Sequence, residues 1–218
     1  MSAPRAAPDF AFERSFWRAG LDVVAGVDEV GRGALAGPLV AAAVVFPAAA
    51  GPALRRLTKL LGAVRDSKEL PPERRTALVG PVRESACGVG IGIVEPGELD
   101  ALGLAAANRV AMERAVLALP CQPHALLLDA CTLDLGLPQS GPIGADGRCL
   151  SVAAASIIAK TTRDALMVAS DDEDPRYGFV HHKGYGSALH LRRLDEHGPG
   201  PLHRRCFAPV ARLLGTVP

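Results

Sequence analysis

Short apolar runs alternate along this chain with longer segments of helix-forming residues. The runs predict β-strands over residues 23–27, 39–46, 87–94 and 124–128. The third run alternates Gly with Val or Ile. The fourth is continuously apolar up to Asp129, which is typical of a central strand covered on both faces. The pattern therefore predicts a sheet with buried central strands.

The intervening segments predict helices over residues 72–85, 102–119, 151–169 and 187–197. Pro and Glu begin the first helix, and Pro120 follows the second. Ser187 is a suitable N-cap for the last helix, which stops at Gly198. Residues 1–18 are expected to be a loose or lightly docked start. This order predicts an α/β fold, with a mixed sheet flanked by helices and a C-terminal helical extension.

The composition is that of a globular chain. Of the 218 residues, 49% are hydrophobic and 22% are charged, which argues against a disordered or fibrous protein. Aromatic residues are only 4%, so the core must consist mainly of Ala, Val, Leu and Ile. Residues 33–54 carry no charge, but glycines and prolines interrupt them, and a buried strand between turns is the better interpretation. We therefore expect no membrane association.

The cysteines and the first residues bear on the cellular compartment. The five cysteines are odd in number and form no C-x-x-C pair. We therefore do not expect a disulfide framework or a structural zinc site. We expect the protein to reside in a reducing compartment. No apolar core segment occurs near the start, so no signal peptide is predicted. These features predict a cytoplasmic protein.

Positive charge is concentrated near the C-terminus. Residues 176–218 carry seven Lys or Arg against two acids, although the net charge of the whole chain is only +1. A basic region on an acidic body can hold a polyanion against a metal-binding face. A solvated charged surface is the simpler alternative.

The most informative segment, GVDEVGRGALAGP, runs from Gly26 to Pro38. Asp28 and Glu29 end an apolar run, and acids at strand ends are well placed to bind hard cations through oxygen. The glycines that follow allow a ligand to approach the backbone closely. A charged turn with flexible glycines is the alternative that this segment alone leaves open.

The same segment matches a dinucleotide-binding fingerprint through Gly31, Gly33 and Ala36. That fingerprint requires a helix directly afterwards and an acid about 20 residues later. Pro38 and a strand-like Val/Ala run follow instead, and the next acid is Asp66. We therefore reject a dinucleotide-binding site.

Two further acids are candidates for the same site. Asp129 follows a run of leucines expected to be buried, where a charge is costly unless it is paired or metal-bound. A simple loop acid is the alternative. Asp164 lies four residues after Lys160 in one predicted helix, so the two share a face. They could form an ion pair, or place a carboxylate on a metal and an ammonium near a phosphate.

Six motifs in order resemble one family over nearly the whole chain, from about residue 23 to residue 210. They are GVDEVGRG, DSKEL, LLLDA, SVAAASIIAKTTRD, HHKGYGS and PLHRRCFAPV. Each is weak alone, but six at compatible spacings are specific. The chain resembles ribonuclease HII, a type 2 ribonuclease H. The resemblance implies a ribonuclease H-like catalytic core at residues 20–170, with a helical substrate-binding segment packed on it at residues 171–218.

The resemblance also implies an activity. The family consists of endoribonucleases that hydrolyse the RNA strand of RNA–DNA hybrids. They also incise on the 5′ side of a single ribonucleotide embedded in duplex DNA, leaving 3′-hydroxyl and 5′-phosphate ends, as ribonucleotide excision repair requires. The cofactor would be Mg²⁺ or Mn²⁺, with two ions when substrate is bound, because two ions can activate water and stabilise the leaving 3′-oxygen. A catalytically silent nucleic-acid-binding protein on the same fold is the alternative.

The family's functional residues transfer by resemblance to positions in this chain. Its four catalytic, metal-binding carboxylates correspond to Asp28, Glu29, Asp129 and Asp164. Its substrate-binding residues are the Gly-Arg-Gly loop that reads the 2′-hydroxyl, the lysine of its DSK segment, its helix lysine and its junction-sensing tyrosine. These correspond to Gly31, Arg32, Gly33, Lys68, Lys160 and Tyr185. Ala130 stands where the family usually has Gly, a change that we expect to be tolerated.

Five histidines fall between residues 181 and 203. A zinc site would need converging ligands, but the adjacent His181 and His182 diverge in most backbone conformations and no Cys lies at ligand spacing. We therefore expect polar, phosphate-facing histidines in a basic lobe. No sliding-clamp motif of the glutamine–aliphatic–aromatic type occurs near the C-terminus, and we expect a monomer.

Overall fold

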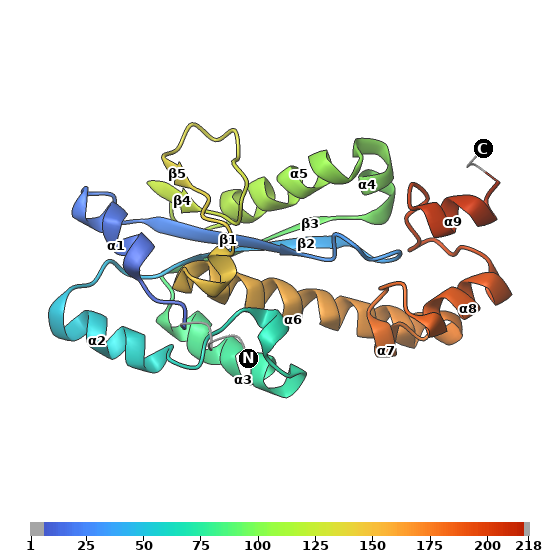
Figure 1. Cartoon of the computed structure of the whole chain (residues 1–218), viewed down its shortest axis with the longest axis horizontal. Helices are drawn as coiled ribbons and strands as arrows, with labels where there is room; N and C mark the ends of the chain where they lie inside the picture. Colours follow the sequence, from blue (N-terminus) through green and yellow to red (C-terminus); the bar gives the residue numbers. More distant parts are fainter. Residues whose placement is uncertain (1–6, 216–218) are drawn as a thin grey trace, which may run out of the picture.

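A five-stranded mixed sheet forms the centre of the computed structural model, which describes residues 7–215 (Figure 1). Its strands are β1 (Val24–Val30), β2 (Leu39–Val45), β3 (Gly88–Val94), β4 (Ala125–Leu127) and β5 (Gln139–Ser140). Their order across the sheet is β3-β2-β1-β4-β5. β1 pairs antiparallel with β2 and parallel with β4. The four predicted strands are confirmed, and the two-residue β5 is an addition too short for a sequence pattern.

Helices cover both faces of this sheet (Figure 1). On one face lie α4 (Pro96–Leu102) and α5 (Leu104–Leu117). On the other lie α2 (Gly51–Leu60), α3 (Pro72–Ser85) and α6 (Leu150–Glu173). The predicted fold class, a mixed sheet flanked by helices, is therefore confirmed.

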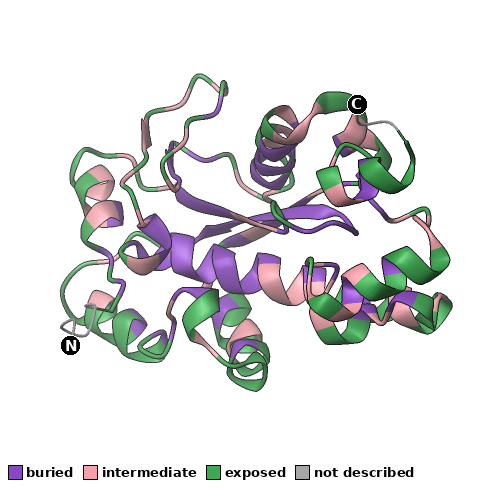
Figure 2. Ribbon diagram, turned by 45° about the vertical axis from the view of Figure 1, so that its right-hand side comes forward, coloured by how far each residue is buried: buried purple, intermediate pink, exposed green. Residues whose placement is uncertain are grey.

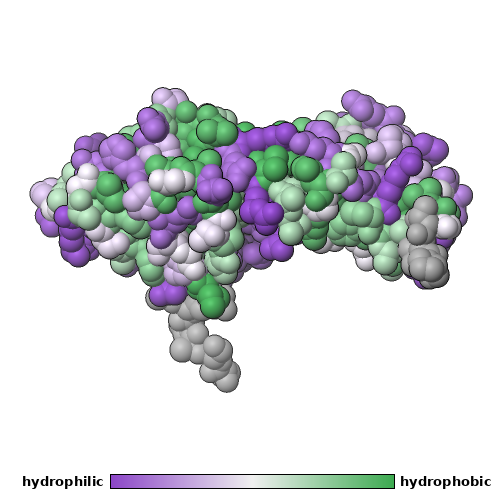
Figure 3. Space-filling view, turned by 90° about the horizontal axis from the view of Figure 1, so that it is seen from above, coloured by the Kyte–Doolittle hydropathy of each residue, from purple (hydrophilic) through white to green (hydrophobic). Residues whose placement is uncertain are grey.

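The remaining helices lie at the two ends of the molecule (Figure 1). Near the start, α1 (Ala11–Arg18) contacts β1 and β4. After α6 in the chain come α7 (Phe179–His182), which packs against α6, then α8 (Ala188–His197) and α9 (Ala208–Leu213), the predicted helical C-terminal region. Short 3₁₀ turns are η1 (Ser67–Glu69), η2 (Ala145–Gly147) and η3 (Pro175–Tyr177). Hydrophilic side chains gather over the middle of the face seen in Figure 3, between the two ends.

Alternating side chains of the central strands build two halves of the core. Ala41 and Ala43 of β2 belong to the cluster beneath α5, whereas Ala42 and Val44 belong to the cluster that includes the first half of α6. This division follows from the two-residue period of a strand. Figure 2 shows the result, with the central strands and the start of α6 buried.

Small residues let the helices approach the sheet closely. A Cβ at Gly90 or Gly92 of β3 would overlap the backbone of Ala115 or Ala111 in α5, which accounts for the Gly alternation of this strand. On the opposite face, a Cβ at Gly26 of β1 would overlap Ser151. The close approach at Gly26 seats α6 against β1, and this contact positions the candidate site.

Some predictions differ from the structure. The helix predicted over 102–119 corresponds to α5, which begins at Leu104 because Gly103, with a φ of +76°, separates it from α4. The start expected to be loose contains α1, because Phe10 and Trp17 pack into the core; residues 1–6 of that segment lie outside the described residues. α6 continues to Glu173, so the division into 20–170 and 171–218 stays a prediction. Within residues 7–215, no helix is both long and apolar enough to span a bilayer.

Candidate active site

β1 carries two neighbouring acids, Asp28 and Glu29, which project to opposite sides of the sheet because side chains alternate along a strand. Asp28 is 6% exposed and faces α6, where the Ser156 hydroxyl contacts it. Burial raises the pKa of Asp28 well above its usual range, and the charges of Glu29 and Asp146 raise it further. Burial also raises the pKa of Glu29, although Arg32 opposes this effect. Buried carboxyls that repel each other are typical of a functional site.

Asp129 reaches the same region from the neighbouring strand. β1 and β4 are parallel, and their last paired residues are Gly26 and Leu127. Asp28 and Asp129 each lie two residues beyond that pair, so both strands carry an acid to the same edge. The Oδ1 atom of Asp129 accepts hydrogen bonds from the backbone N–H groups of Gly144 (2.7 Å) and of the next residue (3.2 Å). These bonds fix the carboxylate beside η2.

The structure adds an acid that the sequence analysis missed, Asp146 in η2. Its Oδ2 lies 3.2 Å from Lys68 Nζ, it is 8% exposed, and its charge contributes to the raised pKa values of Asp28 and Asp66. The one sequence feature that could have identified Asp146 is its position four residues before the longest helix. Its own loop gives no periodicity, so only the packing of η2 against α6 shows that Asp146 lies close to Asp28.

Asp164, by contrast, lies apart from these acids. It follows Ser156, the residue that contacts Asp28, by eight positions in α6, a rise of about 12 Å along the helix axis. Its carboxylate is paired with Lys160 (2.7 Å) and with Arg75 of α3 (3.6 Å). Of the two alternatives for these residues, the structure shows the i,i+4 ion pair. The placement does not support the prediction that Asp164 is the fourth metal-binding carboxylate.

The acids have the right ligand chemistry for a hard cation, but their carboxylates do not converge on one point. Carboxylate oxygens are the ligands that Mg²⁺ and Mn²⁺ prefer. Within residues 7–215, however, no three His, Cys, Asp or Glu side chains lie together in an arrangement that could hold an ion. Asp28 is buried, and nearby acids repel its charge. A bound cation would remove this electrostatic cost.

The Gly31–Gly33 loop follows β1 directly and is exposed at its tip. Arg32 and Gly33 are exposed, and a Cβ at Gly33 would meet no atom within 4 Å. Gly31 is buried with a φ of +94°, a left-handed conformation that favours glycine. Arg32 Nη1 lies 3.5 Å from Glu29 Oε1, so the loop is next to the acids. The open backbone at Gly33 allows a ligand to approach.

Lys68 lies at the acidic group and not in a separate basic patch. Asp66 caps η1 by accepting from the Lys68 backbone N–H at 3.0 Å. Burial opposes the charge of Lys68, but Asp66 and Asp146 outweigh it and raise the lysine pKa. Lys68 therefore brings a permanent positive charge to the edge of the carboxylate group.

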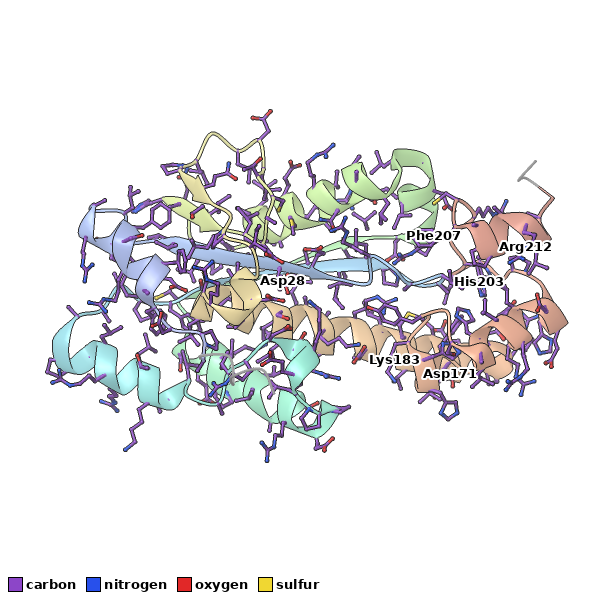
Figure 4. The ribbon with its side chains drawn as sticks, viewed as in Figure 1. Asp28, Asp171, Lys183, His203, Phe207 and Arg212 are labelled. Atoms are coloured by element: carbon purple, nitrogen blue, oxygen red, sulfur yellow. The ribbon has the colours of Figure 1, made fainter. Side chains whose placement is uncertain are left out.

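Lys160 and Tyr185 line a cleft of about 870 Å³ between α3, α6 and α7. Lys160 Nζ lies 5.7 Å from the centre of the Tyr185 ring. Burial lowers the pKa of Lys160, although Asp164 opposes this. Tyr185 also forms a backbone bridge with Ala34, just after the glycine loop. Lys183, another lining residue, marks this end of the molecule in Figure 4, whereas Asp28 lies near the middle.

The buried C-terminal histidines form a neutral hydrogen-bonded network. Gly200 N–H donates to His203 Nδ1 (3.0 Å), so His203 donates through Nε2 to His190 Nε2 (3.0 Å). His190 then donates through Nδ1 to the Tyr185 carbonyl (3.0 Å). Burial lowers the pKa of both histidines to about 4. The expectation of phosphate-facing histidines is wrong for this pair, because aromatic side chains pack around them.

Comparisons with known proteins identify the relatives of this fold. A family model described as Ribonuclease HII matches residues 25–210. A ribonuclease HII of Chloroflexus aurantiacus is 49% identical over 95% of this chain and 96% of its own. Among solved structures, the ribonuclease H2 of Pyrococcus horikoshii superimposes with a TM-score of 0.70 at 26% identity, covering 88% of this chain and 96% of its own. The ribonuclease HII of Archaeoglobus fulgidus, solved in complex with PCNA, gives a TM-score of 0.68 at 26% identity over 87% and 96%.

Proposed function

Because this chain belongs to the ribonuclease HII family, and is thus a metal-dependent endonuclease of the ribonuclease H type, we propose that it hydrolyses the RNA strand of RNA–DNA hybrids and incises on the 5′ side of single ribonucleotides embedded in duplex DNA. The observation that carries this proposal is the position of Asp28, Glu29 and Asp129 at one edge of the sheet, directly beside the Gly31–Gly33 loop. Acids that can hold cations thus adjoin a backbone that a nucleotide can approach.

We propose that Asp28, Glu29, Asp129 and Asp146 hold the divalent ions, and that Asp146 takes the place that the family resemblance gave to Asp164. Mg²⁺ and Mn²⁺ both suit this oxygen-only set. Two such ions, when bound, would supply an activated water and positive charge for the leaving 3′-oxygen. Convergence of the acids around them is expected on binding, because the cations remove the repulsion that now acts on Asp28.

The other residues select and hold the substrate. A 2′-hydroxyl is both donor and acceptor, so the open backbone of the Gly31–Gly33 loop can hydrogen-bond to it and distinguish RNA from DNA. The Tyr185 ring, beside Lys160, would pack on the neighbouring deoxyribose. Lys68 and Lys160 would contact phosphates, and these contacts make binding weaker at high salt.

A catalytically silent binding protein on the same fold is the alternative. One observation favours it: among residues 7–215, no three candidate ligands already converge on a point. Against it stands the cost of a buried acidic group beside a phosphate-binding face, which a binding protein does not need.

Cleavage of a defined substrate separates these two functions. Duplex DNA with one ribonucleotide in a 5′-labelled strand would be incubated with Mg²⁺, with Mn²⁺ and with EDTA, and Asp129→Asn would control for contaminating nuclease. We expect a single cut on the 5′ side of the ribonucleotide, which EDTA and Asp129→Asn both abolish. Tight binding without cleavage in either metal would establish the silent protein instead.

A further inference from the structure

Two arginine side chains, Arg163 of α6 and Arg204 between α8 and α9, are completely buried, with 0% of their surface exposed. In the part of the chain that the structure describes, neither forms an ion pair with a carboxylate. Burying a guanidinium is costly unless its N–H donors find acceptors. Here the acceptors are backbone carbonyls, except that the buried Arg204 Nη2 has no partner among residues 7–215. The positions of these carbonyls indicate what the two cations do.

Arg163 fastens together two segments that lie far apart in the sequence. Its Nε donates to the carbonyl of Pro38 at 2.9 Å, and its Nη2 donates to that of Ala36 at 3.0 Å. Its Nη1 donates to the carbonyl of Lys183 at 2.9 Å. The guanidinium carbon also lies 5.2 Å from the centre of the Tyr185 ring. Arg163 therefore ties the chain after the glycine loop to the chain that carries Tyr185.

Arg204 holds the glycine loop itself. Its Nη1 donates to the carbonyls of Gly31 at 2.6 Å and Arg32 at 3.2 Å, and its Nε donates to that of Gly37 at 3.0 Å. Its backbone N–H donates to the carbonyl of Leu35 at 2.8 Å. One side chain thus holds both ends of the segment from residue 31 to residue 37.

The two guanidinium groups are close enough to repel each other. Burial lowers the pKa of Arg204 to about 10, and the charge of Arg163 is the next cause. Arg204 remains protonated at neutral pH at this value. The molecule therefore keeps two positive charges, with no carboxylate paired to either in residues 7–215, behind the carbonyls of the loop. Apolar side chains could fill this space at lower cost, so the pair is more characteristic of a functional site than of a stabilising one.

We propose that Arg163 and Arg204 are positioning residues that hold the Gly31–Gly33 loop and Tyr185 at a fixed separation, and so determine how strictly the enzyme distinguishes a ribonucleotide from a deoxyribonucleotide. This inference rests on the proposed function, since it assigns the loop and Tyr185 to substrate recognition. The guanidinium is suited to the task because its planar fork reaches two carbonyls at once, which a lysine ammonium on a flexible stem does not reproduce. Their charge adds a second effect, an attraction for the phosphates of any duplex.

The test uses full-length Arg204→Lys, Arg163→Lys and Arg204→Met. Each variant would be assayed in Mg²⁺ on duplex DNA with one ribonucleotide and on a uniform RNA–DNA hybrid, and its binding to an all-DNA duplex would be measured. Leu57→Ala is the matched control, because it removes a buried side chain from α2. Figure 1 shows α2 at the opposite end of the molecule from α7, α8 and α9. Melting temperatures of all variants would be recorded in parallel.

We expect both lysine variants to lose kcat/KM on the single ribonucleotide by about tenfold to a hundredfold, as small misplacements of positioning groups do. Cleavage of the uniform hybrid should fall less, and binding to all-DNA duplex should stay within about twofold, because the charge is kept. Arg204→Met, which also loses the charge, should bind all-DNA duplex more weakly. Leu57→Ala should lower the melting temperature without changing the ratio of the two activities.

Three results would overturn the inference. If the lysine variants keep the wild-type ratio of the two activities, the arginines stabilise the fold and do not set specificity. If neither lysine variant folds, the pair is likewise assigned to stability alone. If the wild type cleaves neither substrate, the proposed function fails and this inference fails with it. The wild-type assay therefore distinguishes the two failures.

Discussion

Lys68 Nζ lies 3.2 Å from the Oδ2 atom of Asp146, so η1 and η2, which are far apart in the sequence, meet at one ion pair. Asp66, which caps η1, is close enough to Asp146 for the charge of Asp146 to contribute to its raised pKa, although burial is the larger cause. Lys68 thus places a positive charge beside the acids at the edge of the sheet. Asp146 is therefore held at the candidate site by Lys68, close enough to Asp28 for the two carboxyls to repel each other.

Substitutions of Asp146 and of Asp164 are expected to have very different effects on kcat. Because Asp146 lies with the acids at the sheet edge and Asp164 is neutralised by Lys160 and Arg75, Asp146→Asn should lower kcat by about 100-fold or more. Asp164→Asn should keep kcat within about tenfold of the wild type. Steady-state cleavage of the single-ribonucleotide duplex measures both. The reverse order would restore Asp164 as the fourth carboxylate.

Asp28→Asn should stabilise the metal-free protein. The pKa of Asp28 is raised in the folded state, so the folded protein binds more protons than the unfolded chain above the ordinary value of 3.8, and stability falls as pH rises through the folded pKa. At pH 8 the ionisable carboxyl is then a cost, because burial and the nearby acids oppose its charge. Its removal should raise the free energy of unfolding by at least about 1 kcal/mol in EDTA.

Urea unfolding at pH 8 and near pH 4 checks the Asp28 prediction. The gain from Asp28→Asn should be largest at pH 8 and should shrink toward pH 4, where the wild-type carboxyl is protonated. Added Mg²⁺ should raise the stability of the wild type and should have much less effect on the variant, because a ligand has been lost. An equal response of both proteins to Mg²⁺ would mean that Asp28 does not bind the ion.

Ala130→Gly should make the protein more stable. Ala130 has a φ of +46°, a left-handed conformation that costs a residue with a Cβ about 1–2 kcal/mol and costs glycine little. Since Ala130 is exposed, little packing is lost, and a gain of about 0.5–1 kcal/mol is expected in urea unfolding. Ala105→Gly, at an exposed position inside α5, is the control and should change stability in the opposite direction.

The His203–His190 network should make stability fall in mild acid. Both pKa values are about 4 in the folded state against 6.5 for a free histidine. Between these values the unfolded chain binds more protons, so stability is complete above about pH 6.5 and is lost as pH falls toward 4. The loss should reach up to about 3 kcal/mol per histidine. Unfolding in urea at pH 7.5, 6 and 4.5 measures this slope.

The double variant His190→Asn/His203→Asn isolates the histidine contribution. Asparagine can keep the hydrogen bonds made at each Nδ1 atom, to the Tyr185 carbonyl and from Gly200 N–H, but it does not titrate. The variant should be less stable at pH 7.5 and should show a shallower slope between pH 6.5 and 4.5. Contributions of opposite sign from Asp28 and Glu29 are common to both proteins and cancel in the difference. Parallel slopes would contradict the network.

Local pattern was sufficient for most of the secondary structure. β2, β3 and the bounds of α3 follow from apolar runs and from Pro–Glu starts, and Ser187 caps α8 as its position predicts, accepting from the His190 N–H at 3.2 Å. The segments that pattern alone misjudged depend on distant partners. α1 forms where Phe10 packs on Phe46, and Gly103, with its positive φ, separates the expected helix α5 from α4, which the pattern did not predict.

The sequence by itself determined the fold class, the family and three of the acids at the sheet edge, because apolar periodicity and motif spacing are properties of neighbouring residues. Only the tertiary structure separated Asp164 from the group and added Asp146, since both decisions depend on where η2 and α3 pack against α6. It also decided which cations line the open cleft and which are completely buried. In the sequence, Arg163 and Arg204 look like ordinary charged residues. In the structure they are buried because backbone carbonyls from two separate segments, residues 31–38 and Lys183, converge on them.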